Sequence, residues 1–302
     1  MANTRRVSVL GVPDSAGAYC VGVERAPAAL RAAGLVARLE AAGVEVHDAG
    51  DLTERRWRPD RVRPRVQNLD DEVAAVRETA DAVADRLGPD ARVLVLGGSC
   101  VVALGLCGAF VRRGERPRLV YLDRHLDLNT PESTEEGSLS WMGMAHALGV
   151  DGAAPELVGA FGDSPLLRPE DVVHLGVELE QTTAFEREQV EALGVAVVPQ
   201  QRLVDAPADA ATEALGHLGA GPFTVHVDVD VLDFMDAPLA ENVNGRNRGP
   251  TVEQLGLALA ALLRRPDCRG LSIGQLDPAH AESDPDALSR FVDVVVAALT
   301  TS

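Results

Sequence analysis

The feature that most constrains this sequence is a regular alternation of short apolar runs with longer amphipathic stretches. The short runs are rich in Val and Leu along their whole length, as is typical of strands buried on both faces of a parallel sheet. They lie at residues 7–12, 44–48, 93–96, 119–122, 172–175, 195–198, 224–229 and 270–273. Helices are expected in the longer stretches between them, at residues 26–42, 69–87, 181–193, 208–218, 252–263 and 285–299. The pattern predicts a three-layer α/β/α fold with a mostly parallel sheet of about eight strands.

The same alternation continues through the whole chain of 302 residues. Three segments look irregular, at residues 51–68, 151–171 and 233–250, but none has the character of a linker between domains. We therefore predict one domain over residues 1–302.

Charge and cysteine content narrow the classes of partner and compartment. A net charge of −18 would repel nucleic acid phosphates and anionic membranes, so we expect neither as a partner. The four cysteines lie far apart and form no CxxC pair, which indicates free thiols in a reducing cytoplasm. No stretch approaches the roughly 18 apolar residues that would span a bilayer.

Two aspartate-rich segments follow predicted strands. Asp123, His125 and Asp127 alternate after the run at 119–122, and on an extended chain they would share one face. That arrangement favours a metal site, with a solvated helix-capping turn as the alternative. Asp228 and Asp230 also alternate, and carboxylates this close repel each other unless a proton or a cation lies between them.

Two further features accompany these segments. His226 lies on the same predicted face as Asp228, and we interpret it as a buried, hydrogen-bonded histidine rather than a ligand. The run at 93–96 enters Gly97-Gly98-Ser99-Cys100, a turn before a helix that lacks the residues of a phosphate-binding loop. Cys100 is then either a thiolate favoured by the helix start or an inert buried cysteine.

Together these segments resemble the ureohydrolase family of arginases, agmatinases and formiminoglutamases. That family has a Gly-Gly-Asp-His turn, an Asp-Ala-His-x-Asp strand end and an Asp-x-Asp-x-x-Asp-Pro strand end, in the order and spacing found here. The likeness extends along most of the chain. It implies an arginase-like fold and a hydrolase that cleaves a linear C–N bond of a guanidino, amidino, ureido or formimino group in a small molecule. It also implies a homo-oligomer, a trimer or a hexamer.

The resemblance implies two divalent metal ions, Mn²⁺ in this family. The six implied ligands are Cys100, Asp123, His125, Asp127, Asp228 and Asp230. Asp123 and Asp228 would bridge the two ions. Asp127 would complete one ion together with Cys100, which stands in the place of a family histidine, and the other two ligands would complete the second ion. A hydroxide bridging the metals would attack the substrate carbon, and Asp127 would hold and pass its proton.

Several positions depart from the family pattern. The softer ligand Cys100 would favour zinc or iron, or leave one metal labile. Gln275 stands where the family has a glutamate that grips a guanidinium, and a neutral amide suits a less cationic group. Ser140 stands where arginases have a proton-shuttling histidine, and His146 is the candidate replacement. Arg124 would reach either an acidic substrate group or a surface carboxylate.

Two more substrate-binding candidates complete the set. Asn129 matches the arginase position that helps hold the substrate's α-carboxylate, and Glu180 lies in the region that faces the α-amino group in arginases. The alternative to a hydrolase is an inactive or regulatory relative, favoured by the changes at 275 and 140. A nucleotide-binding enzyme is disfavoured, because acidic strand ends would repel phosphate.

Overall fold

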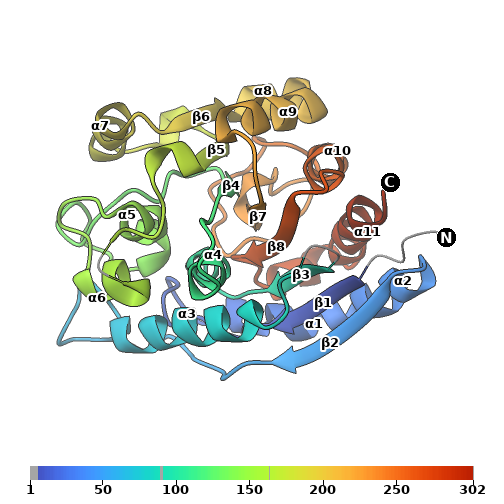
Figure 1. Cartoon of the computed structure of the whole chain (residues 1–302), viewed down its shortest axis with the longest axis horizontal. Coiled ribbons are helices and arrows are strands. Elements are labelled where there is room, and N and C mark those ends of the chain that lie inside the picture. Colours follow the sequence, from blue (N-terminus) through green and yellow to red (C-terminus); the bar gives the residue numbers. More distant parts are fainter. Residues whose placement is uncertain (1–5, 89–90, 163, 302) are drawn as a thin grey trace.

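The computed structural model describes residues 6–88, 91–162 and 164–301, and these build around an eight-stranded sheet (Figure 1). All strand pairs are parallel, in the order β2-β1-β3-β8-β7-β4-β5-β6. The strands are β1 (Arg6–Gly11), β2 (Glu45–Asp51), β3 (Ala91–Leu96), β4 (Leu119–Leu122), β5 (Val172–Val177), β6 (Ala196–Pro199), β7 (Phe223–Asp228) and β8 (Cys268–Gly274). Each overlaps a predicted apolar run, so the predicted parallel sheet is confirmed.

Helices connect the strands and pack on both faces of the sheet. The α-helices are α1 (Ala26–Ala32), α2 (Leu35–Ala41), α3 (Leu69–Ala84), α4 (Val102–Arg112), α5 (Gly143–Leu148), α6 (Pro155–Val158), α7 (Ala184–Leu193), α8 (Gln200–Asp205), α9 (Pro207–Leu218), α10 (Val252–Leu263) and α11 (Ala287–Thr300). Short 3₁₀ helices are η1 (Val23–Arg25), η2 (Leu139–Met142), η3 (Gly159–Phe161), η4 (Pro169–Asp171), η5 (Leu179–Gln181), η6 (Val229–Val231) and η7 (His280–Ser283). Among the described residues, no helix combines the length and the apolar character needed to cross a membrane.

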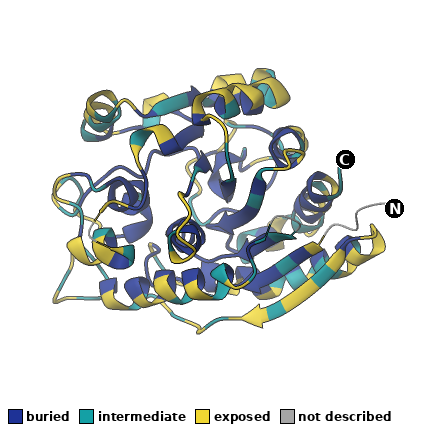
Figure 2. Cartoon of the chain, viewed as in Figure 1, coloured by how far each residue is buried: buried dark blue, intermediate teal, exposed yellow. Residues whose placement is uncertain are grey.

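The two faces of the sheet bury different helices, as the alternation of side chains in a strand requires. In β3, Leu94 and Leu96 belong to the core that includes α1, α2 and α8 to α11. Val93 and Val95 point the other way, into the core with α3 and α4. Figure 2 shows the buried strands between helices whose outer faces are exposed. The predicted three-layer α/β/α arrangement is therefore confirmed.

Helix boundaries differ from the prediction where local geometry intervenes. The single helix expected at residues 26–42 is two helices, because Gly34 adopts a left-handed conformation with φ 88° between them. The helix expected from residue 181 begins at Ala184 instead. There Thr183 and Glu186 form a capping box, in which each side chain accepts a hydrogen bond from the backbone N–H of the other residue.

The order of the strands brings the candidate site together. β3, β8, β7 and β4 are neighbours in the sheet, and the segments that follow them contain Cys100, Gln275, Asp230 and Asp123. Because the strands are parallel, these segments all emerge at one edge of the sheet, where ligands bind in folds of this type.

Candidate metal centre

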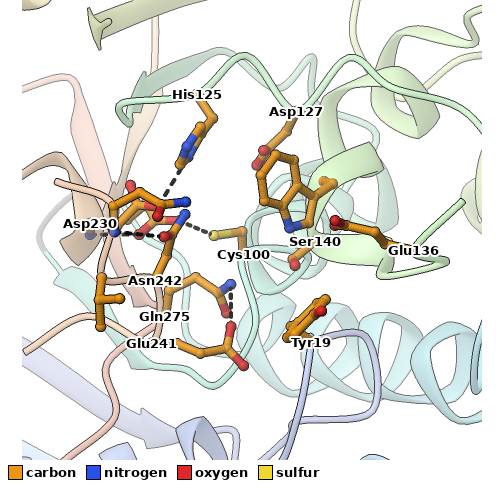
Figure 3. A pocket seen from close by; sticks show the side chains of 14 residues that line it. Tyr19, Cys100, His125, Asp127, Glu136, Ser140, Asp230, Glu241, Asn242 and Gln275 are labelled. Carbon is orange, nitrogen blue, oxygen red and sulfur yellow. Dashed lines mark hydrogen bonds and ion pairs between the residues drawn. The ribbon is translucent and has the colours of Figure 1, made fainter. Parts of the chain in front are cut away.

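Five of the six predicted ligands lie in two buried groups that share one aspartate. Figure 3 shows three of them, Cys100, His125 and Asp230. One group is Cys100, Asp123 and Asp228, and the other is Asp123, His125 and Asp230. Within each group the potential ligand atoms all lie within 4.8 Å of one another. Asp123 is therefore placed between the two groups, as a bridging ligand would be.

The local geometry that brings these aspartates together differs from the one predicted. β4 ends at Leu122, so Asp123 to Asp127 lie in a loop, and Asp127 has a left-handed backbone with φ 51°. Asp230 lies in η6, just after β7. The expectation that strand alternation aligns these residues is wrong, because each loop turns on its first aspartate.

The two turns use the same hydrogen bond. Asp123 Oδ1 accepts the backbone N–H of His125 at 2.6 Å, and Asp228 Oδ1 accepts that of Asp230 at 2.8 Å. Such aspartate turns compete with the strand for the backbone and end it. The second carboxylate oxygen of Asp123 has no hydrogen-bond partner among the described residues, whereas that of Asp228 meets the Cys100 thiol.

The carboxyl groups repel one another in this buried setting. Burial, together with the charge of Asp230, raises the pKa of Asp123 to about 6. Burial likewise raises the pKa of Asp228 well above its usual range, and the charges of Asp230 and Asp123 add to the effect. Burial also raises the pKa of the Cys100 thiol, which donates to Asp228 Oδ2 at 2.5 Å. Without further positive charge, these groups hold their protons more tightly than free carboxyl and thiol groups do.

The residues present fit a pair of divalent cations. Three buried atoms of the groups, Asp123 Oδ2, His125 Nε2 and Asp230 Oδ1, have no hydrogen-bond partner among the described residues. Leaving a buried polar atom without a partner costs about 1–3 kcal/mol. A divalent cation would satisfy all three atoms and remove the repulsion, and carboxylate, imidazole and thiolate are all ligands of such ions.

Asp127 lies outside these two groups but lines the same cavity. Its carboxylate accepts a hydrogen bond from the Tyr121 hydroxyl. The Tyr121 ring stacks on His226 at 4.9 Å between centroids, and His226 Nδ1 lies 2.9 Å from Ser272 Oγ. His226 is thus a buried, hydrogen-bonded histidine, as interpreted from the sequence. The sequence analysis did not predict a role for Tyr121 at the site. The only feature that could have indicated one is a tyrosine in an otherwise aliphatic strand.

A cavity of about 320 Å³ opens beside the metal ligands. Of the residues predicted to bind substrate, Ser140 and Gln275 line this cavity. Ser140 Oγ lies 2.8 Å from Ser138 Oγ. Glu241 also lines the cavity but was missed, because its segment looked irregular in the sequence and carried no family motif. Tyr19, from the loop after β1, lines the same end of the cavity as Glu241 (Figure 3).

Three of the residues predicted for substrate binding or proton transfer are not among the described residues that line the cavity. Asn129 is buried, and its Oδ1 accepts from Ser133 Oγ at 3.0 Å. His146 is buried with Nδ1 2.6 Å from the Met142 carbonyl oxygen, and burial lowers its pKa to about 4. Glu180 is exposed and forms an ion pair with an arginine of the 233–250 segment.

Arg124 is fully buried and serves neither of the two roles considered from the sequence. Its guanidinium donates to the backbone carbonyls of Asp230 at 2.8 Å, Leu232 at 3.0 Å and Arg248 at 2.8 Å. It also donates to the buried carboxylate of Glu178 at 3.0 Å. Arg124 is therefore an internal clamp on the segment that carries Asp230.

Comparison with known proteins decides the family. A model of the arginase family matches residues 5–299. The chain belongs to the arginase family. It is 32% identical to an arginase of Brevibacillus brevis over 238 residues, which cover 78% of each chain. Human arginase-1 is 26% identical over 310 residues, covering 98% of this chain and 92% of the relative.

A solved structure shows the same relationship at the level of the fold. The arginase of Bacillus caldovelox superposes with a TM-score of 0.85 at 25% identity and covers 99% of both chains. The predicted ureohydrolase resemblance and the arginase-like fold are therefore confirmed. The departures of this arginase-family chain from the family motifs at Cys100, Ser140 and Gln275 all line one cavity. They therefore alter the site itself rather than the scaffold around it.

Proposed function

We propose that this arginase-family chain is a metal-dependent hydrolase of a linear C–N bond in a guanidino, amidino, ureido or formimino group. The observation that supports this most is the pair of buried ligand groups sharing Asp123 at the wall of a cavity. Several carboxyl groups are buried there at a cost that cations would offset. A relative that only binds a partner has no evident need for such a cluster.

In this proposal the two groups hold two divalent cations, with Mn²⁺ as the family's metal. When bound, the cations would lower the pKa of a water molecule and neutralise charge that develops on the substrate. Following the family, we further propose a homo-oligomer of three or six copies and a cytoplasmic location.

The chain's own residues would handle the proton. Asp127 lines the cavity, and the Tyr121 hydroxyl orients its carboxylate. We assign to Asp127 the transfer of a proton to the leaving nitrogen. The buried His146 is directed to the carbonyl of Met142, so we do not assign this step to it.

The first test is metal content per chain after loading with Mn²⁺, combined with turnover on a panel of guanidino, ureido and formimino compounds. We expect two equivalents in the wild type. Asp228→Asn should retain at most one and lose about a hundredfold or more in turnover, because a ligand oxygen is replaced by an amide nitrogen. The exposed Asp209→Asn on α9 is a matched control and should behave as wild type.

The outcomes separate the two functions considered from the sequence. A wild type that binds no metal would contradict the hydrolase and favour an inactive relative. An Asp228→Asn variant with full turnover would contradict the assignment of this site to the reaction.

A further inference from the structure

Glu241 and Gln275 form a fixed pair at the cavity wall (Figure 3). The backbone N–H of Glu241 donates to the Gln275 carbonyl at 2.8 Å, and Gln275 Nε2 donates to Glu241 Oε2 at 3.0 Å. The backbone N–H of Gln275 donates to the Gly98 carbonyl at 2.8 Å. Residue 275, in a left-handed conformation with φ 57°, is therefore held on both sides of its peptide and through its side chain.

This pairing determines which way the Gln275 amide faces. A carboxylate only accepts hydrogen bonds, so the amide nitrogen must be the atom that faces Glu241. The amide oxygen, Oε1, is then left on the other side. It is buried and has no hydrogen-bond partner among the described residues. An N–H donor from a ligand in the cavity is the natural partner for such an acceptor.

The Glu241 carboxylate has no ion pair with a cation among the described residues. Its Oε1 accepts from the Cys20 backbone N–H at 3.2 Å and from the Cys20 thiol at 3.4 Å, both uncharged groups. Burial raises the pKa of Glu241, as expected for a carboxyl with no cation beside it. Of the described residues that line the cavity, none is a lysine or an arginine. The part of the wall formed by Glu241 and Gln275 therefore offers acceptors and negative charge.

We propose that Glu241 supplies the charge for substrate recognition that Gln275 lacks, and that Gln275 adds a neutral acceptor oriented by Glu241. The group recognised is then an N–H-rich cation, an amidinium or a guanidinium. This inference rests on the proposed function, since it names the substrate class of the same site. It replaces the expectation of a less cationic group, which considered residue 275 without its partner.

The test compares two small probes of nearly the same shape, acetamidinium and acetamide, which differ in charge. Both are titrated calorimetrically into metal-loaded protein at low ionic strength. We expect wild type to bind acetamidinium about tenfold more tightly than acetamide, because charge-assisted hydrogen bonds are the stronger ones. Glu241→Gln should remove this preference and leave acetamide binding within about twofold. Glu136→Gln, which alters an exposed carboxylate at the same cavity, should keep the preference for acetamidinium.

A swapped variant tests the role of charge apart from shape. Glu241→Gln combined with Gln275→Glu keeps one amide and one carboxylate in contact, and should recover the preference for acetamidinium. Equal binding of the two probes by wild type would overturn the inference, as would a full preference in Glu241→Gln. If Glu241→Gln does not fold, the ratio of the two probe affinities in wild type and in the swapped variant still tests the inference.

Metal content and turnover are measured on the same samples. Two bound metals with turnover but no charge preference would overturn this inference alone. A charge preference in a protein without metal or turnover would support the recognition pair and contradict the proposed hydrolysis.

Discussion

At the scale of single residues, the thiol of Cys100 is the main departure from the family's ligand set. It lies just before α4, lines the cavity and contacts Asp228 directly. A thiolate is a soft ligand, whereas the aspartates around it are hard ones. We therefore expect the choice of metal to depend on this one side chain.

We expect Cys100→Ser to change metal preference more than metal capacity. In competition dialysis with equal Zn²⁺ and Mn²⁺, the bound Zn²⁺ to Mn²⁺ ratio should fall about tenfold, because the serine oxygen is a harder ligand than sulfur. Elemental analysis of the protein measures the ratio. Cys107→Ser, in α4 and directed to Thr224, is the control that should not change it. An unchanged ratio in Cys100→Ser would mean that the thiol is not a ligand.

Sequence motifs predicted the residues that gather into the two candidate ligand groups, because ligand chemistry and spacing are local properties. They did not predict Glu241 or Tyr121, whose roles depend on distant partners. Glu241 meets Gln275, 34 positions away, and Cys20, 221 positions away. Asn129 and Glu180 were predicted for the site from family positions, and His146 from its helical spacing to Ser140. The structure places all three beyond the cavity lining among the residues that it describes.

At the scale of elements, the segment after β7 owes its shape to Arg124. The guanidinium joins three carbonyls of this segment to Glu178, which follows β5. Sequence patterns predicted the strands on either side but not this clamp. From the sequence alone, an arginine inside an acidic motif is expected at the surface, and only its partners in the fold show that it is buried.

Arg124→Met should lower the free energy of unfolding by about 3–5 kcal/mol, because buried carbonyls and a buried carboxylate lose their donor. Urea denaturation followed by circular dichroism measures the change. Arg112→Met, which removes an exposed ion pair with Asp81 on α3, should cost less than about 1 kcal/mol. Equal losses in the two variants would argue against a clamp.

At the scale of the whole molecule, stability couples to pH through a buried carboxyl pair outside the two candidate ligand groups. Asp14 follows β1 and Glu72 lies on α3, and both are almost completely buried. Burial raises the pKa of Asp14 to about 6. Burial, with the charge of Asp14, raises the pKa of Glu72 well above its usual range. The native state therefore retains protons that the unfolded chain releases.

The sign of the effect follows from those raised pKa values. The contribution of the protonated pair to the free energy of unfolding is fully present below about pH 4. It is lost as pH rises through about 6 and beyond. Glu72→Gln keeps an amide donor for Asp14 but removes one of the two titrating groups. Measured by urea unfolding, the variant should gain about 2 kcal/mol on wild type between pH 5 and pH 8.

Taking the difference between the two proteins cancels the carboxyl groups of the metal centre. Glu78→Gln, on the same helix but ion-paired with Arg55, should shift by less than about 1 kcal/mol over that window. A difference between Glu72→Gln and wild type that does not vary with pH would show that the pair does not share protons in this way.

The position of β8 in the sheet has a consequence for how the protein is made. This strand is the last of the eight along the chain, yet it lies between β3 and β7 and pairs with both. While the chain is being synthesised, the middle of the sheet cannot form until residues 268–274 have left the ribosome. Contacts between residues so far apart in sequence form slowly. The edge of β3 therefore stays unpaired from residue 96, and that of β7 from residue 228, until β8 is made. This is the interval in which we expect the nascent chain to depend most on chaperones.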